Sequence, residues 1–375
     1  MKELGDELDG LLVVSLEQAV AAPYCGLLLS NSGARVIKVE RPDGDFARGY
    51  DAGADGQSAI FAWLNRGKES VCLDLKNPRD LEVMLAMLRK ADVFVSNLAP
   101  GAVARLGLSG ETLRANNARL ICVTLSGYGE DGDAAKRKAY DFLVQGETGV
   151  CSVTGTPTNP SRVGISVTDL STGLTAYSAV LRALIKRSIT GCGFDIKLSM
   201  FDVVADWMNM PLLQHRYSGG APKRSGLQHS FVAPYGAFKC QDEKNILLSV
   251  QNNREFADFC VQVLKQPNLI YDPRFSQNPD RYLNRVALDQ IVNTVFAKMS
   301  QEEVILMLDS AHIANAKLND VADLSTHPFL RNSTAKIGTA HVEMAALPVC
   351  TARHRTELVP GLGEHTKKIR KEFTK

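Results

Sequence analysis

The sequence predicts an α/β protein in which a large domain, a Rossmann-like parallel sheet wrapped by helices, is joined to a smaller α+β domain. Three observations lead to this fold class. Strand and helix patterns alternate through roughly the first two hundred residues, as in parallel sheets. The 375 residues exceed the about 250 to 300 that one core usually supports. Near residue 218 a stretch rich in Gly, Pro and Lys begins, which is typical of a linker.

Short apolar runs and amphipathic segments alternate along the first domain. The first strand is followed by a helix that starts with small residues, and the second strand ends in Glu40-Arg41. Ligands bind at the carboxyl ends of parallel strands, so we expect the site there. The predicted strands are 11–16, 34–39, 70–73, 93–95 and 120–125, and the predicted helices between them are 23–31 and 78–90.

Asp169 stands where an apolar, strand-like run from Val163 ends and a helical pattern from Leu170 to Arg187 begins. Asp is among the best N-cap residues, so the local pattern alone favours a helix cap. A carboxylate can also be a nucleophile. The two roles are compatible, because a helix N-terminus favours the ionised form. Asp169 is therefore the first candidate for a catalytic residue.

The second half of the chain predicts a smaller domain. Residues 235–250 have hairpin character, and helical patterns follow at 254–265, 284–299 and 301–308. The last segment is too small to fold alone, so we expect it to return to the large domain. The expected organisation is a CoA-binding and catalytic domain at 1–217, a linker and smaller domain at 218–330, and a return segment at 331–375.

Composition excludes several classes of protein. The formal charge of +2 gives no reason to expect a nucleic-acid or membrane partner. Residues 1–10 have no signal-peptide pattern, and no apolar run is long enough to span a membrane, so we expect a cytoplasmic protein. Eight cysteines without a Cys-x-x-Cys pair predict free thiols rather than disulfides or zinc ligands. We expect no metal site.

Two common enzyme classes are disfavoured by missing motifs. The loop from Glu17 to Pro23, after the first strand, lacks the glycines with which a dehydrogenase approaches the pyrophosphate of NAD. The chain has no Gly-x-Ser-x-Gly elbow, and its histidines have no metal-ligand spacing. An NAD-dependent dehydrogenase and a Ser or Cys hydrolase are therefore not expected.

Six separate blocks, in their order and spacing, resemble the class III CoA-transferases of the carnitine-CoA and formyl-CoA transferase type. Agreement at six places by accident is improbable, and weaker traces follow at 233–238 and 360–366. The blocks are Ala21-Ala22-Pro23-Tyr24, 33–41, Leu73-Asp74-Leu75-Lys76, 97–101, Gly127-Tyr128-Gly129 and the segment around Asp169.

The resemblance implies that Asp169 is the nucleophile in a transfer of CoA between two carboxylic acids. Its carboxylate would attack the donor thioester to form a mixed anhydride, which the released CoA thiolate would convert into an aspartyl-CoA thioester. The acceptor acid would reverse the sequence. The CoA thioester is then a substrate, and no permanently bound cofactor is expected. The formyl type also carries a glycine run that serves the tetrahedral intermediates, and this chain has none.

The same resemblance implies a set of CoA-binding residues. Basic side chains in the set can meet the phosphates of CoA, and the others offer hydrogen bonds or apolar contact. Taken singly, each Lys or Arg is more often a solvated surface charge. The implied CoA-binding residues are Ala19, Arg41, Leu73, Lys76, Asn97, Leu98, Arg105, Lys138 and Tyr140.

The stretches 44–51 and 61–68 resemble the branch that uses succinyl-CoA and a small dicarboxylic acid such as itaconate, mesaconate, citramalate or malate. A second carboxylate on the substrate needs a cationic partner, and Arg48 is the candidate. A structural ion pair is an equally good interpretation of Arg48. The resemblance also implies an interlocked homodimer.

Two alternative functions stay open. An α-methylacyl-CoA racemase would share the aspartate but needs a histidine before Asp141, where this chain has Tyr140. Tyrosine, as a residue type with an ordinary pKa near 10, is a poor acid/base partner. A non-catalytic CoA-binding protein would keep Lys76 and Arg105 but has no need of Asp169. The sequence therefore favours the transferase.

Overall fold

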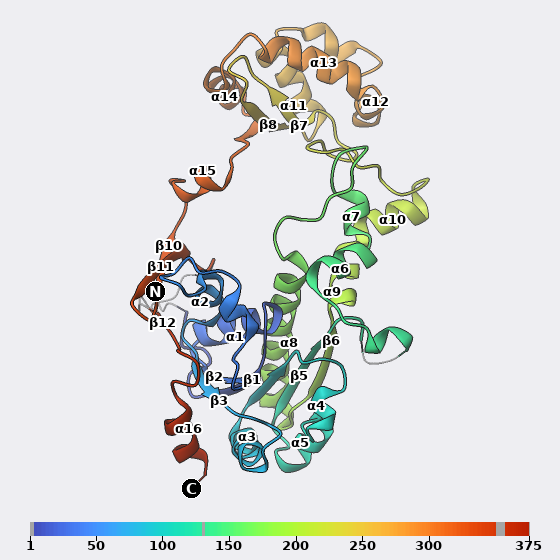
Figure 1. Ribbon diagram of the computed structural model, residues 1–375. Coiled ribbons are helices and arrows are strands. Elements are labelled where there is room, and N and C mark those ends of the chain that lie inside the picture. The colour runs from blue at the N-terminus through green and yellow to red at the C-terminus, as the bar shows by residue number, and fades with distance from the viewer. Residues whose placement is uncertain (1–3, 130–131, 350–356, 375) are drawn as a thin grey trace. The chain divides into compact units, whose positions relative to one another are not determined.

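The computed structural model describes residues 4–129, 132–349 and 357–374, so Cys350 and part of the expected return segment lie outside the described residues (Figure 1). The chain divides into two compact units. Unit 1 comprises 1–150, 162–210 and 331–375, and unit 2 comprises 151–161 and 211–330. The boundary near 210 lies earlier than the expected 217, and the short segment before residue 162 also belongs to unit 2.

Unit 1 is built on a six-stranded sheet in which every neighbouring pair is parallel, in the order β3-β2-β1-β4-β5-β6. The chain reverses its direction of travel across the sheet between β1 and β4, which is where doubly wound sheets open a crevice for ligands. The strands are β1 (Leu12–Leu16), β2 (Arg35–Glu40), β3 (Glu69–Cys72), β4 (Val93–Ser96), β5 (Ile121–Ser126) and β6 (Asp195–Ser199).

Helices cover both faces of this sheet, because successive strand residues point to opposite faces. Val13 packs in a cluster with α1 and α8, whereas Val14 packs in a cluster with α3, α5 and α16. The helices of unit 1 are α1 (Ala21–Asn31), α2 (Ala59–Asn65), α3 (Pro78–Lys90), α4 (Ala102–Arg105), α5 (Gly110–Asn116), α6 (Asp141–Glu147), α8 (Val167–Thr190), α9 (Met200–Trp207) and α16 (Thr366–Phe373), with 3₁₀ turns η1 (Phe46–Gly49) and η2 (Asp133–Lys136).

A glycine brings α1 and α8 into close contact. A Cβ at Gly173 would lie 2.4 Å from the carbonyl oxygen of Ala21 and 3.1 Å from the Cβ of Tyr24. No larger residue fits there without moving the backbone. Gly173 lies one turn after Asp169, so this contact fixes the start of α8 against the start of α1, directly beyond the loop that leaves β1.

The last residues of the chain pack within unit 1. A small sheet, β10 (Asn332–Ile337), β11 (Ala340–Ala345) and β12 (Glu357–Val359), shares a buried cluster with Phe61 of α2. Ile369 and Phe373 of α16 pack in the same cluster as α3. Among the helices that the structure describes, none is long and apolar enough to cross a membrane.

Unit 2 has its own core beneath an antiparallel sheet in the order β7-β8-β9, and the predicted hairpin at 235–250 is confirmed. The predicted helix at 254–265 is α11 followed by the π-helical turn η3. The elements are α7 (Val150–Val153), which begins at the unit boundary, α10 (Asn209–Tyr217), which crosses it, β7 (Tyr235–Lys239), β8 (Asn245–Ser249), α11 (Asn253–Asp258), η3 (Phe259–Val263), η4 (Pro267–Tyr271), α12 (Asn278–Leu283), α13 (Arg285–Phe296), α14 (Gln301–Ser310), β9 (Ala314–Lys317) and α15 (Val321–Ser325).

The bounds of each predicted strand of the large sheet lie within one residue of the observed bounds. The prediction of a strand-like run before Asp169 is wrong. Residues 163–166 form no strand, because the amide of Val163 donates to the Gln145 side chain (2.8 Å) instead of to a neighbouring strand. Helix α8 begins at Val167 with Ser166 at its N-cap position. Asp169 is therefore the third residue of the helix and not its cap.

Candidate active site

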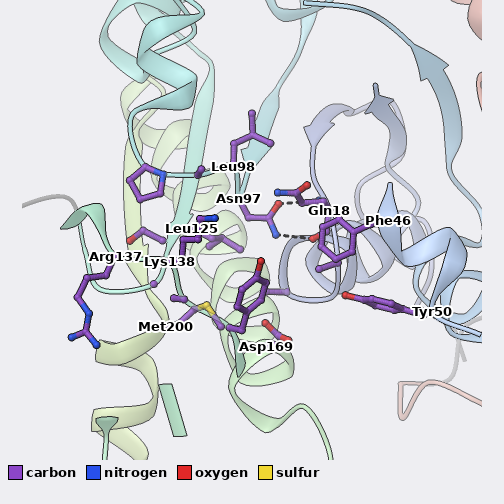
Figure 2. A pocket seen from close by; sticks show the side chains of 18 residues that line it. Gln18, Phe46, Tyr50, Asn97, Leu98, Leu125, Arg137, Lys138, Asp169 and Met200 are labelled. Atoms are coloured by element: carbon purple, nitrogen blue, oxygen red, sulfur yellow. Dashed lines mark hydrogen bonds between the residues drawn. The ribbon is translucent and has the colours of Figure 1, made fainter. Parts of the chain in front are cut away.

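Loops that follow three neighbouring strands enclose a pocket of about 230 Å³ at the carboxyl edge of the sheet (Figure 2). Gln18 and Ala19 come after β1, residues 97–100 after β4, and Ser126 and Gly127 at the end of β5. Asp169 reaches the same pocket from the first turn of α8. The pocket is thus at the switch point between β1 and β4 that the topology predicts.

The start of α8 is held by Asp141, the first residue of α6. One oxygen of its carboxylate accepts hydrogen bonds from the amides of Thr168 (2.8 Å) and Asp169 (3.2 Å). The other accepts from the side-chain amide of the buried Gln145 (2.7 Å), which also binds Val163. Asp141 therefore occupies the amides to which a carboxylate at the start of a helix would otherwise bind.

The Asp169 carboxylate itself has no hydrogen-bond partner in the described part of the chain. Burial and, to a smaller extent, the negative charge of Asp141 together raise its pKa to about 7. This differs from the expectation that the helix N-terminus holds Asp169 ionised, because Asp141 has taken the helix amides. An unpartnered carboxylate that gains a proton near neutral pH is typical of catalytic acids, bases and nucleophiles.

Asn97 joins the loops that follow β1 and β4. Its side-chain oxygen accepts from the amide of Gln18 (2.9 Å), and its side-chain nitrogen donates to the carbonyl of Gln18 (2.8 Å), as Figure 2 shows. Both ends of the Asn97 amide are therefore used to fix the pocket wall. This is a structural role that the sequence did not predict for it.

Asp45 joins two further parts of the wall. One carboxylate oxygen accepts from the amide of Ala19 (3.2 Å), which has a positive φ of 64°, and from the amide of Ala47 in η1 (3.0 Å). The other accepts from the ammonium group of Lys38 (2.8 Å). Asp45 thus fixes the β1 loop relative to the segment that carries Phe46 and Tyr50.

Buried charges beneath the β1 loop form a closed network with Asp45. Glu17 binds Lys68 (2.5 Å) and Lys38 (3.4 Å), and all of these side chains are buried. Although burial acts to raise it, the two ammonium groups hold the pKa of Glu17 at about 2. Two lysines face two carboxylates, so the network carries no net charge when all are ionised, which makes its burial tolerable.

Phe46, the first residue of η1, and Tyr50, which directly follows η1, line the pocket, and the sequence did not single them out. Their rings pack edge to face with centroids 5.7 Å apart. Burial raises the pKa of Tyr50 to about 12, and the charges of Asp45 and Asp169 act in the same direction. The stretch 44–51, from which the substrate class was predicted, was the signal that could have identified them.

The structure brings the predicted CoA-binding residues around one edge of the sheet, and their role in binding stays a prediction. Leu98 lies at the junction of three adjoining pockets. Ala19, Asn97, Leu98, Lys138 and Tyr140 line the Asp169 pocket, Arg41, Leu73, Lys76 and Leu98 line a pocket of about 300 Å³ beside β1 to β3, and Arg105 and Leu98 line one of about 630 Å³ beside β5.

Arg48 is not among the residues that line these pockets. Its guanidinium donates to both oxygens of Glu40 (2.8 and 2.7 Å) and to the carbonyl of Pro360, and it lies 4.0 Å from the ring centre of Phe61. These contacts agree with the structural ion pair that was the alternative interpretation. Recognition of a substrate carboxylate by Arg48 stays a prediction that the contacts do not support.

No described cysteine lines the Asp169 pocket. The described cysteines are free, and Cys25, the nearest to the β1 loop in sequence, is buried with its pKa raised to about 12. In the described ranges no three His, Cys, Asp or Glu side chains are grouped so as to hold a metal ion. The carboxylate of Asp169 is therefore the nucleophile candidate that the pocket presents.

Comparison with known proteins identifies the family of this chain. The family model described as CoA-transferase family III matches residues 8–366. The chain belongs to this family. As a class III CoA-transferase it is 36% identical to the acetyl-CoA:oxalate CoA-transferase of Acetobacter aceti, over 97% of this chain and 95% of that protein. It is 29% identical to the succinate–glutarate CoA-transferase of Agrobacterium fabrum, over 98% and 95%.

Solved structures share the fold of this class III CoA-transferase. A CAIB/BAIF family protein from Brucella suis matches with a TM-score of 0.83 and 30% identity, over 98% of this chain and 99% of that one. A hypothetical protein from Mycobacterium tuberculosis matches with a TM-score of 0.85 and 27% identity, over 96% and 98%. Both matches extend over nearly the whole of each chain.

The raised pKa of Asp169 predicts the pH dependence of the CoA-transferase. If the ionised carboxylate attacks, kcat/KM rises with pH through about 7, the pKa of Asp169. Asp141→Asn removes the neighbouring charge and keeps an oxygen for the helix amides, so the rise should move to lower pH by roughly 0.5 to 1 unit. Glu82→Gln, the same change on the exposed face of α3, should leave the profile unchanged. An unchanged profile in the Asp141 variant contradicts the assignment.

Proposed function

We propose that this CoA-transferase moves CoA from succinyl-CoA to a small dicarboxylic acid through an aspartyl-CoA thioester on Asp169. One observation carries the proposal. The Asp169 carboxylate enters a pocket at the switch point of the sheet, and no described residue donates a hydrogen bond to it. A carboxylate so placed is free to form a bond to an acyl carbon, whereas one bound in a salt bridge is not.

The chemistry explains why an aspartate suits this transfer. Exchange of CoA between two acids starts and ends with a thioester and a carboxylate, so a third carboxylate can stand in for either acid. The Asp169 oxygen attacks the thioester carbon and expels the CoA thiolate, which leaves a mixed anhydride. The thiolate then attacks the Asp169 carbon and expels the first acid. A pKa of about 7 makes this carboxylate more nucleophilic than an exposed one.

The adjoining pockets suggest how CoA lies. The thioester end belongs beside Asp169, with Lys138 and Tyr140 on the same pocket wall. Arg41 and Lys76 offer positive charge to phosphates in the neighbouring pocket, where Leu73 offers an apolar surface to the adenine. Leu98 lines both pockets, so one extended molecule passing over it can reach from one to the other.

The relatives support the dicarboxylate class for the acids. Those named above act on oxalate and on succinate with glutarate, and a Haloarcula hispanica relative, 29% identical over 87% of this chain, is a succinyl-CoA:mesaconate CoA-transferase. The candidate acceptors are therefore oxalate, glutarate and mesaconate, together with the itaconate, citramalate and malate that the sequence resemblance implies. The protein needs no bound cofactor for this reaction, since the CoA thioester is itself the substrate.

The proposal predicts that Asp169→Ala reduces CoA transfer at least roughly a thousandfold, because no anhydride can form without the carboxylate. Transfer is measured by mass spectrometry of the CoA thioesters formed from succinyl-CoA and each candidate acid, with butyrate as the monocarboxylic control. Glu82→Ala removes an exposed carboxylate from α3 and should leave turnover unchanged. Substantial transfer by a folded Asp169→Ala variant rules out the nucleophile, and a preference for butyrate rules out the dicarboxylate class.

We also propose that the protein is a homodimer of interlocked chains, as its resemblance to the family implies. Large apolar side chains of unit 1 are exposed on the single chain, including Ile185 (66%), Ile189 (75%) and Trp207 (56%). Apolar groups exposed along one pair of consecutive helices, α8 and α9, are typical of a contact surface. The stretch 218–226 and the chain after Leu330 would be ordered spans that link the two units.

The mass of one chain is 40.8 kDa. The dimer proposal predicts a single sedimenting species of twice this mass at micromolar and at nanomolar concentration. Interlocked chains cannot separate without unfolding, so dilution should not release monomers. Analytical ultracentrifugation of the fluorescently labelled protein measures this directly. A monomer that appears on dilution and reassociates on concentration contradicts the interlocked arrangement.

A further inference from the structure

We propose that Tyr50 is a catalytic residue of this site, whose neutral hydroxyl donates a hydrogen bond to the oxyanion formed when Asp169 attacks the thioester. The proposal rests on the function proposed above and assigns a residue that neither the sequence motifs nor the comparisons single out. Attack on a thioester needs a donor for the carbonyl oxygen, and this chain lacks the glycine run that serves this purpose in the formyl-type enzymes.

The position of Tyr50 is fixed by contacts on both sides of η1. Asp45 caps the start of the turn by accepting from the amide of Ala47, and it is itself bound to the buried Lys38. Arg48 is bound to both oxygens of Glu40. The Tyr50 amide donates to the carbonyl of Ala47 (3.2 Å). The segment that presents Tyr50 is therefore anchored to the buried charges, as a preorganised donor must be.

The side chain is aimed into the pocket. Tyr50 lines it together with Asp169, and Figure 2 shows the hydroxyl end directed toward the part of the pocket where Asp169 lies. The ring packs against Phe46, which restricts how the hydroxyl can turn. When Asp169 is bonded to an acyl carbon, the Tyr50 hydroxyl is therefore placed to donate to the oxygen of that acyl group.

Electrostatics keep the hydroxyl protonated. Burial and the carboxylates of Asp45 and Asp169 raise the pKa of Tyr50 to about 12, and Tyr140 contributes in the same direction. Asp45 and Asp169 are both negative, and each disfavours a phenolate. Tyr50 is therefore available as a donor over the whole pH range in which Asp169 ionises.

The step balances without any further reactant. A bond forms between an Asp169 oxygen and the thioester carbon, and the π electrons of the C=O bond move to its oxygen, which accepts the hydrogen bond from Tyr50. The electrons return as the C–S bond breaks, and the CoA thiolate leaves. The hydroxyl donates a hydrogen bond and keeps its proton, so the step requires no proton to be supplied or removed.

The test compares Tyr50→Phe with Tyr177→Phe. Tyr177 lies on α8 and its hydroxyl shares a hydrogen bond with Ser32 (2.7 Å) away from the pocket. Tyr50→Phe should lower kcat for succinyl-CoA about 100-fold, as expected when one oxyanion donor is lost, and change KM for the donor by less than about twofold, because the bond forms only in the transition state. Tyr177→Phe should leave kcat unchanged.

Rapid-quench mass spectrometry supplies a second readout. The aspartyl-CoA thioester should form on Asp169 in Tyr50→Phe, but about 100-fold more slowly. A wild-type kcat in Tyr50→Phe overturns the inference. A rise in KM with no loss of kcat also overturns it. If kcat falls in Tyr140→Phe and not in Tyr50→Phe, the inference is also overturned, because the donor is then Tyr140. Absence of the thioester in the wild-type protein would instead contradict the function proposed for Asp169.

Discussion

The site depends on one contact, the pair of hydrogen bonds from the start of α8 to Asp141. A carboxylate in the first turn of a helix ordinarily turns back to the free amides. Here a different carboxylate already accepts from them, so Asp169 is left without a partner, and the charge that occupies the helix amides also raises the pKa of Asp169. The same contact therefore fixes the start of the helix that carries the proposed nucleophile, and it adds to the effect of burial on the pKa of Asp169. Gln145 holds Asp141 from the other side.

The opposite wall of the pocket is rigid for a different reason. A buried network of Glu17, Lys38, Asp45 and Lys68 lies beneath it, and removing any one partner would leave a buried charge uncompensated, at a cost of about 3 to 5 kcal/mol. The network does not by itself make the fold stable, because desolvation offsets most of the attraction. It fixes the positive-φ conformation at Ala19 and the position of η1, on which the geometry of the Asp169 pocket depends.

The sequence predicted most of the large sheet and placed the site at its carboxyl edge, because both depend on patterns of residues close together in the chain. Strand periodicity predicted five of the six strands of the sheet, with β6 missed, and the order of motifs singled out Asp169 and most of the loops around it. It did not predict what depends on distant residues meeting. The capping of α8 by Asp141 joins positions 28 apart, and the pairing of Arg48 with Glu40 and Pro360 requires the end of the chain. The apolar run before Asp169 imitates a strand because its pattern does not reveal that Gln145 takes the Val163 amide.

The proposed function requires a covalent bond to Asp169, and trapping that bond tests the proposal most directly. The protein is incubated with succinyl-CoA without an acceptor, treated with hydroxylamine, digested, and analysed by peptide mass spectrometry. An acyl bond to a carboxylate yields a hydroxamate, so the account predicts this modification on Asp169 and on no other residue, and none when succinyl-CoA is left out. A CoA or acyl label on a cysteine, or an unmodified Asp169 in protein that is turning over, would contradict it.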